Sequence, residues 1–166
     1  IYDVSQEESI QRLNKVLAHR CSPLKLGGVF HAGLEVHGLE WSFGWSDDPS
    51  VPGVSSNEPT RHEGHHYRQT VRLLDTRFDA EGVRETLQQL SSEYPGPDYD
   101  MFARNCCHFA DDFAQRLGAG RIPAWVYRLA RIAARIDRML QAASSAPREL
   151  GRRVPWVRAR SRLRSV

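Results

Sequence analysis

Hydrophobic residues recur every three to four positions in four segments of the chain, and this spacing predicts helices that each bury one face. The first segment follows Ser5, a suitable N-cap, and places Ile10 and Leu13 on its apolar stripe. The other three helices are expected at 80–93, at 106–117 and at 123–141. Each is long enough to need a neighbouring element that covers its apolar face.

Apolar and polar residues alternate in the stretches between these helices, which indicates strands. Ile1–Val4 is a short candidate. Val29–His37 alternates as a longer one, and after a turn at Gly38 the chain can return as a second strand over Leu39–Trp45. Tyr67–Leu74 alternates in part and is expected to form a further strand. The pattern therefore predicts an α+β fold in which a small antiparallel sheet packs against helices.

Two stretches between the elements leave alternatives open. Ser46–Gly64 is rich in Asp, Pro, Ser and Gly, so it is expected to be a loop without a core of its own, either a mobile flap or an insertion. Trp41, Phe43 and Trp45 could line a substrate groove. Because alternating aromatic residues on a strand usually pack inward, we interpret them as core residues.

Cys106 is the first residue of the helix expected at 106–117. Asn105 can cap this helix, Phe109 and Phe113 follow on its buried face, and Gly118 ends it. Free backbone N–H groups and the positive end of the helix dipole favour a thiolate in the first turn. This is the position of a nucleophile in cysteine hydrolases. The alternative is a buried structural cysteine, because free cysteine is among the most buried residue types.

A nucleophilic cysteine needs a base, and His31 is the candidate. It lies near the start of a predicted strand, and its small neighbours Ala32 and Gly33 leave room for another element. A histidine on a strand and a thiolate at a helix start can form a Cys–His dyad although they are distant in sequence. A histidine on a strand is otherwise more often a surface or core residue.

The sequence HEGHH at His62–His66 matches the HExxH pattern of zinc peptidases. That pattern works only on a helix, and here Gly64 sits in its middle, a proline-rich loop precedes it and no third ligand follows at suitable spacing. The interpretation is a solvated histidine cluster that binds metal only adventitiously. We therefore predict no metal ion and no cofactor.

The chain has 166 residues, enough for one domain with a hydrophobic core. Three cysteines, two of them adjacent, cannot build a disulfide framework, which favours a reducing, intracellular location in the cytoplasm, the nucleus or both. The sequence contains no secretory signal and no apolar run of transmembrane length. It starts without Met, so it is interpreted as a trimmed or partial sequence.

Charge is divided unevenly along the chain. Residues 1–120 contain 11 Lys and Arg against 18 Asp and Glu, a net charge of −7, whereas residues 121–166 contain 12 Arg against two acidic residues, a net charge of +10. The last helix and the basic tail at 142–166, expected to be disordered, could bind an anionic membrane surface or an acidic partner. Nucleic acid is a less favoured partner, because no recognisable nucleic-acid-binding fold accompanies the tail.

Four stretches together resemble the PPPDE superfamily of permuted papain-like thiol peptidases, which includes the desumoylating isopeptidases. They are Tyr2-Asp3-Val4, the glycine- and histidine-containing GGVFHAGLEVHGLEWSFG, the spacer Gln69–Tyr94 and YDMFARNCCHFADDFAQRLGAGRIPAWV. The resemblance covers roughly residues 1–130. It implies a permuted papain-like fold, with a peptidase domain over 1–141, His31 as the catalytic histidine and Cys106 as the nucleophile. One departure is Cys107, where the family usually has Asn or another polar residue.

The resemblance further implies an isopeptidase that removes ubiquitin or a ubiquitin-like modifier such as SUMO from conjugated proteins. The residues themselves leave two alternatives open. The same dyad could cleave the thioester of an S-acylated protein. The chain could also be a non-catalytic adaptor that binds partners through its arginine-rich tail.

Overall fold

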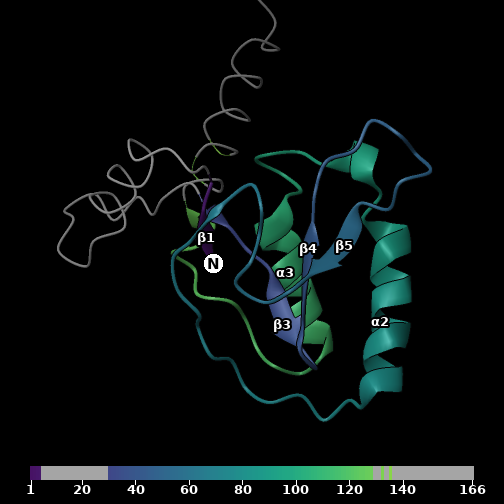
Figure 1. Ribbon diagram of the computed structural model, residues 1–166, viewed down its shortest axis with the longest axis vertical. Helices are drawn as coiled ribbons and strands as arrows, with labels where there is room; N and C mark the ends of the chain where they lie inside the picture. Colours follow the sequence, from purple (N-terminus) through teal and green to yellow (C-terminus); the bar gives the residue numbers. More distant parts are fainter. Residues whose placement is uncertain (5–29, 129–131, 133–134, 136–166) are drawn as a thin grey trace, which may run out of the picture.

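The computed structural model describes residues 1–4, 30–128, 132 and 135. They form two three-stranded antiparallel sheets, with strand orders β2-β1-β6 and β3-β4-β5, and two α-helices (Figure 1). This arrangement confirms the predicted α+β class. The elements are β1 (Tyr2–Asp3), β2 (Phe30–His31), β3 (Leu34–Val36), β4 (Leu39–Phe43), β5 (Val54–Asn57), β6 (His66–Tyr67), α2 (Ala80–Glu93), the 3-10 helix η1 (Gly96–Asp98) and α3 (Cys106–Arg116).

Local sequence signals account for both helices. The Asp79 side chain caps α2 by accepting from the Gly82 N–H at 2.9 Å, and α2 has the predicted bounds. At the end of α3, Gly118 has a φ of +71°, which glycine adopts without steric cost. This conformation lets the Ala119 N–H reach the Ala114 carbonyl at 2.9 Å, which closes the last turn.

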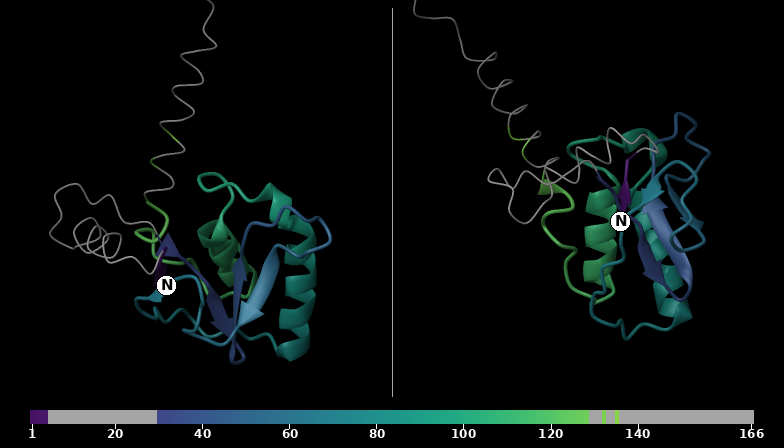
Figure 2. Two further views of the ribbon diagram at one scale, coloured as in Figure 1. Left: turned by 45° about the horizontal axis from the view of Figure 1, so that its top comes forward. Right: turned by 60° about the vertical axis from the view of Figure 1, so that its left-hand side comes forward.

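Strand β4 and the two helices enclose one of two cores. Helix α3 packs against both β4 and α2, and the two turned views show both helices beside the β3-β4-β5 sheet (Figure 2). Phe43, Phe109 and Phe113 are fully buried at this junction. Burying aromatic side chains of this size provides much of the free energy that holds the helices against the sheet.

The second core surrounds the N-terminal end of α3. It joins Phe30 and Ala32 to the two cysteines of α3 and to the segment that follows the helix, where Val126 is 2% exposed. This core fixes β2 against the start of α3. The elements that carry His31 and Cys106 are therefore held together by apolar packing.

The predicted strand over Val29–His37 is in fact broken into β2 and β3. Strand β2 pairs with β1, whereas β3 pairs with β4 in the other sheet, and Ala32 and Gly33 lie between them. A Cβ on Gly33 would lie 2.3 Å from Glu40 Oε1, so glycine permits the buried Glu40 carboxylate to approach the backbone here. The chain changes sheets at this point, which the alternation of residues did not reveal.

Three further expectations need correction. Ser46–Gly64 is not a loop throughout, because β5 pairs along β4. The strand expected at Tyr67–Leu74 is limited to β6, since its partner β1 is only two residues long. Trp45 lies beyond the end of β4 and is 66% exposed, so it is not a core residue, whereas Phe43 is.

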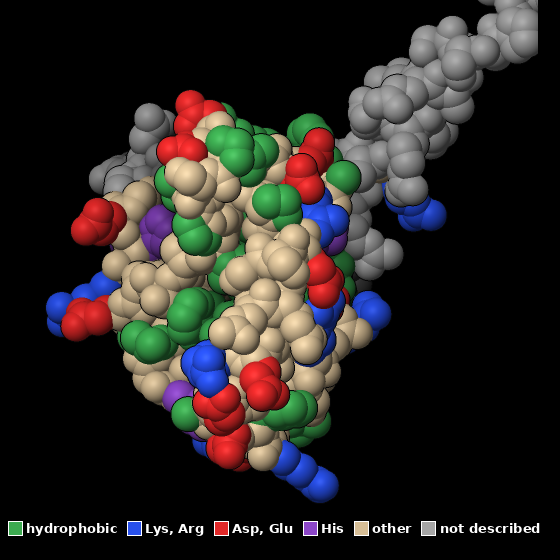
Figure 3. All heavy atoms as spheres, turned by 90° about the vertical axis from the view of Figure 1, so that its right-hand side faces the viewer, with side chains coloured by type: hydrophobic (Ala, Val, Ile, Leu, Met, Phe, Trp, Pro, Cys, Tyr) green, Lys and Arg blue, Asp and Glu red, His purple; other side chains and the backbone are tan. Residues whose placement is uncertain are grey.

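The helix predicted after Ser5, most of the helix predicted at 123–141 and the tail at 142–166 lie outside the described residues. Within the described ranges, no helix is long and apolar enough to cross a membrane. On the face that carries α2, basic and acidic side chains are interspersed, and hydrophobic side chains appear in small separate groups (Figure 3).

Candidate active site

The Asn105 side chain sets the start of α3 and thereby the position of Cys106. Its Oδ1 accepts from the N–H groups of Cys107 at 3.0 Å and His108 at 3.2 Å, and its amide donates to the Met101 carbonyl at 2.6 Å. Cys106 is therefore the first residue of the helix, as predicted. Its thiol lies at the positive end of the helix dipole and is only 4% exposed.

Strand β2 delivers His31 to this thiol. His31 pairs opposite Tyr2 in the β1-β2 ladder and is 6% exposed. Hydrogen bonding to His31 and the charge of His31 are among the causes that lower the pKa of the Cys106 thiol. The structure thus brings together the two residues that the sequence singled out.

The two adjacent cysteines have opposite protonation preferences. The pKa of Cys106 is well below its usual range, chiefly because of the hydrogen bond with Cys107; burial opposes this shift, and the His31 hydrogen bond and charge add to it. The pKa of Cys107 is well above its usual range, since it donates that hydrogen bond and is buried. The two sulfurs are 4.0 Å apart, and Cys107 Sγ is also 3.6 Å from the Phe30 carbonyl. These opposite directions favour ionisation of Cys106 over ionisation of Cys107.

Tyr99 also contacts the thiolate, which sequence reasoning missed. Its hydroxyl donates to Cys106 Sγ at 3.9 Å, while the Cys106 backbone N–H points at the hydroxyl oxygen. Burial, followed by the neighbouring thiolate charge, raises the pKa of Tyr99 well above its usual range. Tyr99 is therefore a neutral hydrogen-bond donor beside the nucleophile. Only its place seven residues before Cys106, directly after η1, could have suggested this position.

The rings of His62 and His65 pack against that of His31. The HEGHH segment lies in a turn that leads into β6, not on a helix, so His62 and His66 do not share the helical face that a zinc peptidase requires. His66 is exposed, as expected for a solvated cluster. His62 and His65 are instead half-buried, with ring centroids 4.6 Å and 4.7 Å from that of His31.

Burial favours the neutral forms of His62 and His65. It lowers the pKa of His62, with a smaller contribution from the His31 charge, and it lowers the pKa of His65 to about 4. Both imidazoles are therefore uncharged near neutral pH and can accept hydrogen bonds or ligate metal ions.

Tyr2, which is buried and hydrogen bonds to Glu40, packs against His31. The Tyr2 hydroxyl donates to Glu40 Oε2 at 2.7 Å, and the Thr60 N–H donates to the same oxygen at 3.1 Å. The Tyr2 ring centroid lies 5.9 Å from that of His31. These bonds restrict the orientation of Tyr2 and hence the space that His31 can occupy.

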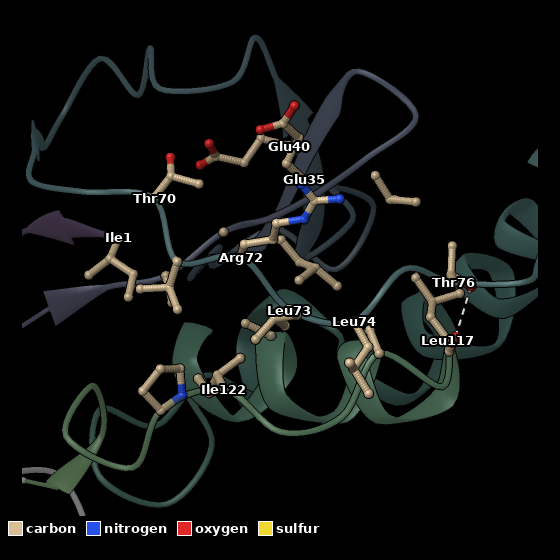
Figure 4. Close-up of a pocket in the computed structure, with 18 of the residues that line it drawn as sticks. Ile1, Glu35, Glu40, Thr70, Arg72, Leu73, Leu74, Thr76, Leu117 and Ile122 are labelled. Atoms are coloured by element: carbon tan, nitrogen blue, oxygen red, sulfur yellow. Dashed lines mark hydrogen bonds between the residues drawn. The ribbon is translucent and has the colours of Figure 1, made fainter.

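A cavity of about 480 Å³ lies beside the site. The extended segment 70–76 forms one side of it, with Arg72 near Glu35 and Glu40, and Leu73, Leu74 and Ile122 face α3 (Figure 4). Ala32, the residue after His31, lines it, but neither His31 nor Cys106 does. The reacting groups are therefore outside this cavity.

Comparison of the sequence with known proteins identifies a family. The model of the family described as "PPPDE putative peptidase domain" matches residues 1–144. A DeSI-like protein of Arabidopsis thaliana is 36% identical over 105 residues, which cover 63% of this chain and 46% of that protein. The DeSI-like protein sdu1 of Schizosaccharomyces pombe is 29% identical over 133 residues, covering 80% of this chain and 62% of that protein.

Desumoylating isopeptidase 1 of Homo sapiens is 32% identical over 121 residues, covering 69% of this chain and 67% of that protein. The chain spans less than two thirds of the length of the Arabidopsis and Schizosaccharomyces relatives. The family match nevertheless covers most of the chain and contains every residue of the site just described. The chain therefore belongs to the PPPDE peptidase domain family.

Proposed function

We propose that this chain is a cysteine isopeptidase that removes SUMO or a related ubiquitin-like modifier from lysine side chains of conjugated proteins. One observation carries the chemistry: Cys106 is the first residue of α3, and its pKa lies well below its usual range because of hydrogen bonds to Cys107 and to His31 and because of the His31 charge. The substrate class is supported by relatives from Homo sapiens and Caenorhabditis elegans that are named as desumoylating isopeptidases or their homologues. We propose SUMO first on this ground.

In the proposed reaction, the Cys106 thiolate attacks the carbonyl carbon of the isopeptide bond while His31 is an imidazolium. As the C–N bond breaks, His31 gives its proton to the departing lysine amine, which leaves a thioester on Cys106. His31, now neutral, takes a proton from water as that water attacks the thioester. The modifier leaves with a free carboxylate, and the thiolate–imidazolium pair is restored.

The negative oxygen formed in each attack needs hydrogen-bond donors. The N–H groups of Cys107 and His108 are directed at Asn105 Oδ1, so the helix start has fewer available donors than its geometry alone suggests. Before the attack, the Cys106 N–H is directed at the Tyr99 hydroxyl, and that hydroxyl is directed at the sulfur. Once the sulfur bonds to carbon and loses its charge, the hydroxyl is released, and we assign the role of oxyanion donors to the Cys106 N–H and the Tyr99 hydroxyl. Asn105 acts through the cap that positions Cys106.

The test is covalent labelling with SUMO and ubiquitin whose C-termini carry an electrophile. We expect a SUMO adduct on wild-type protein, no adduct on Cys106→Ala and strongly slowed labelling of His31→Ala. Cys107→Ser should still be labelled, because serine keeps a hydrogen-bond donor beside Cys106. Peptide mapping of the adduct identifies the modified sulfur.

Other outcomes separate the alternatives. An adduct on Cys107 would show that the nucleophile is Cys107 and not Cys106. Failure of every modifier probe combined with turnover of an S-acylated peptide would favour the thioesterase, and inactivity of a folded protein towards both substrates would favour the adaptor. Preference for the ubiquitin probe would support the proposed reaction but would identify ubiquitin, and not SUMO, as the modifier.

A further inference from the structure

Three imidazoles converge beside the nucleophile, and the proposed hydrolysis uses only one of them. The ring centroids of His62 and His65 are 4.4 Å apart, and both rings lie at similar distances from His31. Each histidine offers a ring nitrogen that lies within 4.8 Å of the nitrogens offered by the other two. We propose that His31, His62 and His65 form a binding site for a divalent ion of the zinc class, and that the bound ion stops His31 from acting as acid and base.

The geometry is close to that of a three-histidine metal site. Zinc bound by nitrogen at about 2.0–2.1 Å in a tetrahedral arrangement separates its ligand nitrogens by about 3.4 Å. The rings therefore need to close by at most about 1.4 Å. His62 and His65 can make this movement because they lie on a partly exposed turn, whereas His31 is held in a strand.

The available ring nitrogens support a ligand in this space. His31 Nε2 and His65 Nδ1 are both buried, and neither has a hydrogen-bond partner among the residues that the structure describes. Buried polar atoms normally have a partner, so two unpartnered nitrogens in one cluster indicate a missing one. His31 is itself more than nine-tenths buried.

The donor set selects the class of ion. Three imidazoles suit zinc and the neighbouring transition metals, whereas calcium and magnesium require oxygen ligands. Glu40 is a buried carboxylate that already accepts from Tyr2 and Thr60 through Oε2. Its Oε1 has no hydrogen-bond partner among the described residues, but Glu40 does not belong to the cluster of possible ligands. The segment supplies its ligands from His62 and His65 in a turn, so the site differs from the helical HExxH arrangement.

A bound ion interferes with the chemistry through His31. The metal replaces one ring proton of the imidazolium, so His31 can no longer cycle between its neutral and charged forms. This inhibitory consequence rests on the proposed function, whereas binding of the ion does not. Zinc would thus control the same residue that protonates the lysine leaving group.

The first experiment measures binding alone. Protein without a polyhistidine tag is treated with a chelator, dialysed and titrated with Zn²⁺ by calorimetry. Wild-type protein is expected to bind one ion per chain. His62→Gln and His65→Gln are each expected to weaken binding by more than about tenfold, since loss of even an outer-shell partner costs 10–100-fold. His66→Gln is the matched control, because His66 is exposed in the same segment and outside the cluster.

Circular dichroism confirms that each variant is folded, and a Cys106→Ala protein reports whether the thiolate is needed. Equal zinc affinity of the wild-type, His62→Gln and His65→Gln proteins would overturn the proposal. So would binding that is lost in Cys106→Ala but unchanged in both histidine variants, because the ion would then be held by thiolate.

The second experiment measures hydrolysis of a SUMO C-terminal substrate with and without Zn²⁺. Zinc is expected to lower the rate of the wild-type and His66→Gln proteins by about 100-fold or more, the range for loss of a general acid and base. His65→Gln is compared with its own zinc-free rate and should resist inhibition. Tight binding without inhibition would overturn the regulatory part, and a protein that is inactive without zinc but binds it normally would contradict the proposed function alone.

Discussion

Cys106 and Cys107 are neighbours in the chain, yet the protein stabilises a negative charge on only one of the two sulfurs. The hydrogen bond with Cys107 is the largest cause of the low Cys106 pKa. Burial acts in the opposite direction, and the hydrogen bond and charge of His31 lower the pKa further. A residue that looked like a departure from the family pattern therefore contributes to the low pKa of the proposed nucleophile. Its role is that of a donor and does not require sulfur.

Substitution of Cys107 should consequently change the pKa of Cys106. Loss of the donor in Cys107→Ala is expected to move the pH dependence of Cys106 alkylation by iodoacetamide to higher pH. The sign follows from the thiolate being the reactive form: a raised pKa means that less thiolate is present at a given pH. Cys107→Ser keeps a donor and should remain close to wild type. Coincident profiles for Cys107→Ala and wild type would contradict the assignment.

Tyr99 makes the second testable contribution at this scale. Tyr99→Phe removes a hydroxyl beside the sulfur and should lower kcat by at least about tenfold with little effect on KM, because an oxyanion donor acts mainly in the transition state. Tyr94→Phe is the control, since its hydroxyl bonds to Asp112 at 3.2 Å, away from the site. An equal loss of activity in both variants would indicate a structural effect.

The β2–β3 break positions His31, the proposed acid and base. Because the chain leaves one sheet after His31 and enters the other at Leu34, the imidazole can face α3 while the following hairpin packs elsewhere. The close approach of Glu40 to Gly33 is part of this junction. The junction is therefore sensitive to any added side chain.

Gly33→Ala should destabilise the protein by about 1–3 kcal/mol, the usual cost of overpacking, because the new Cβ would lie 2.3 Å from Glu40 Oε1. Gly44→Ala is the matched control, since no heavy atom outside its immediate neighbours lies within 4 Å of a Cβ at that position. Urea unfolding of both variants provides the measurement. Equal stability of the two variants would show that Glu40 relaxes without cost.

Helices were predictable at this scale, and short strands were not. Both α2 and α3 carry their caps, apolar stripes and ends within a few residues, so their bounds could be obtained from local sequence. Strand β5 has the sequence VSSN and forms because β4 lies beside it, a contact that local composition does not encode. The division of 29–37 between two sheets depends on the same kind of distant pairing.

The candidate site was likewise predictable from the sequence only in part. Cys106 could be found from its helix start, and His31 from its strand and the family resemblance. Tyr99, His62 and His65 have no motif of their own that marks a role beside the nucleophile. Their proximity to Cys106 and His31 arises from tertiary packing of separate segments, which one sequence does not specify.

At the scale of the whole molecule, the charge asymmetry suggests separate roles for the two ends of the chain. The family match ends at residue 144, and residues 142–166 contain seven arginines. A chain that ends at residue 144 should react with the SUMO probe at the wild-type rate, because every proposed catalytic residue lies before that point. It should bind vesicles containing phosphatidylserine more weakly, since each arginine near an anionic surface contributes about 1 kcal/mol. Vesicle sedimentation at two salt concentrations measures this, and unchanged binding would place the membrane contact elsewhere or exclude it.

The burial of Cys106 and His31 has a consequence for which molecules can react. With exposed fractions of 4% and 6%, neither group is open to a bulky reagent, and the covering side chains must move before a carbonyl carbon can reach the sulfur. A slender, unbranched polypeptide end requires the least movement, whereas a folded surface or a side-chain-rich loop requires much more. The enclosure therefore acts as a size filter: it keeps ordinary peptide bonds away from the Cys106 sulfur and also limits the loss of that sulfur to oxidants and bulky thiols.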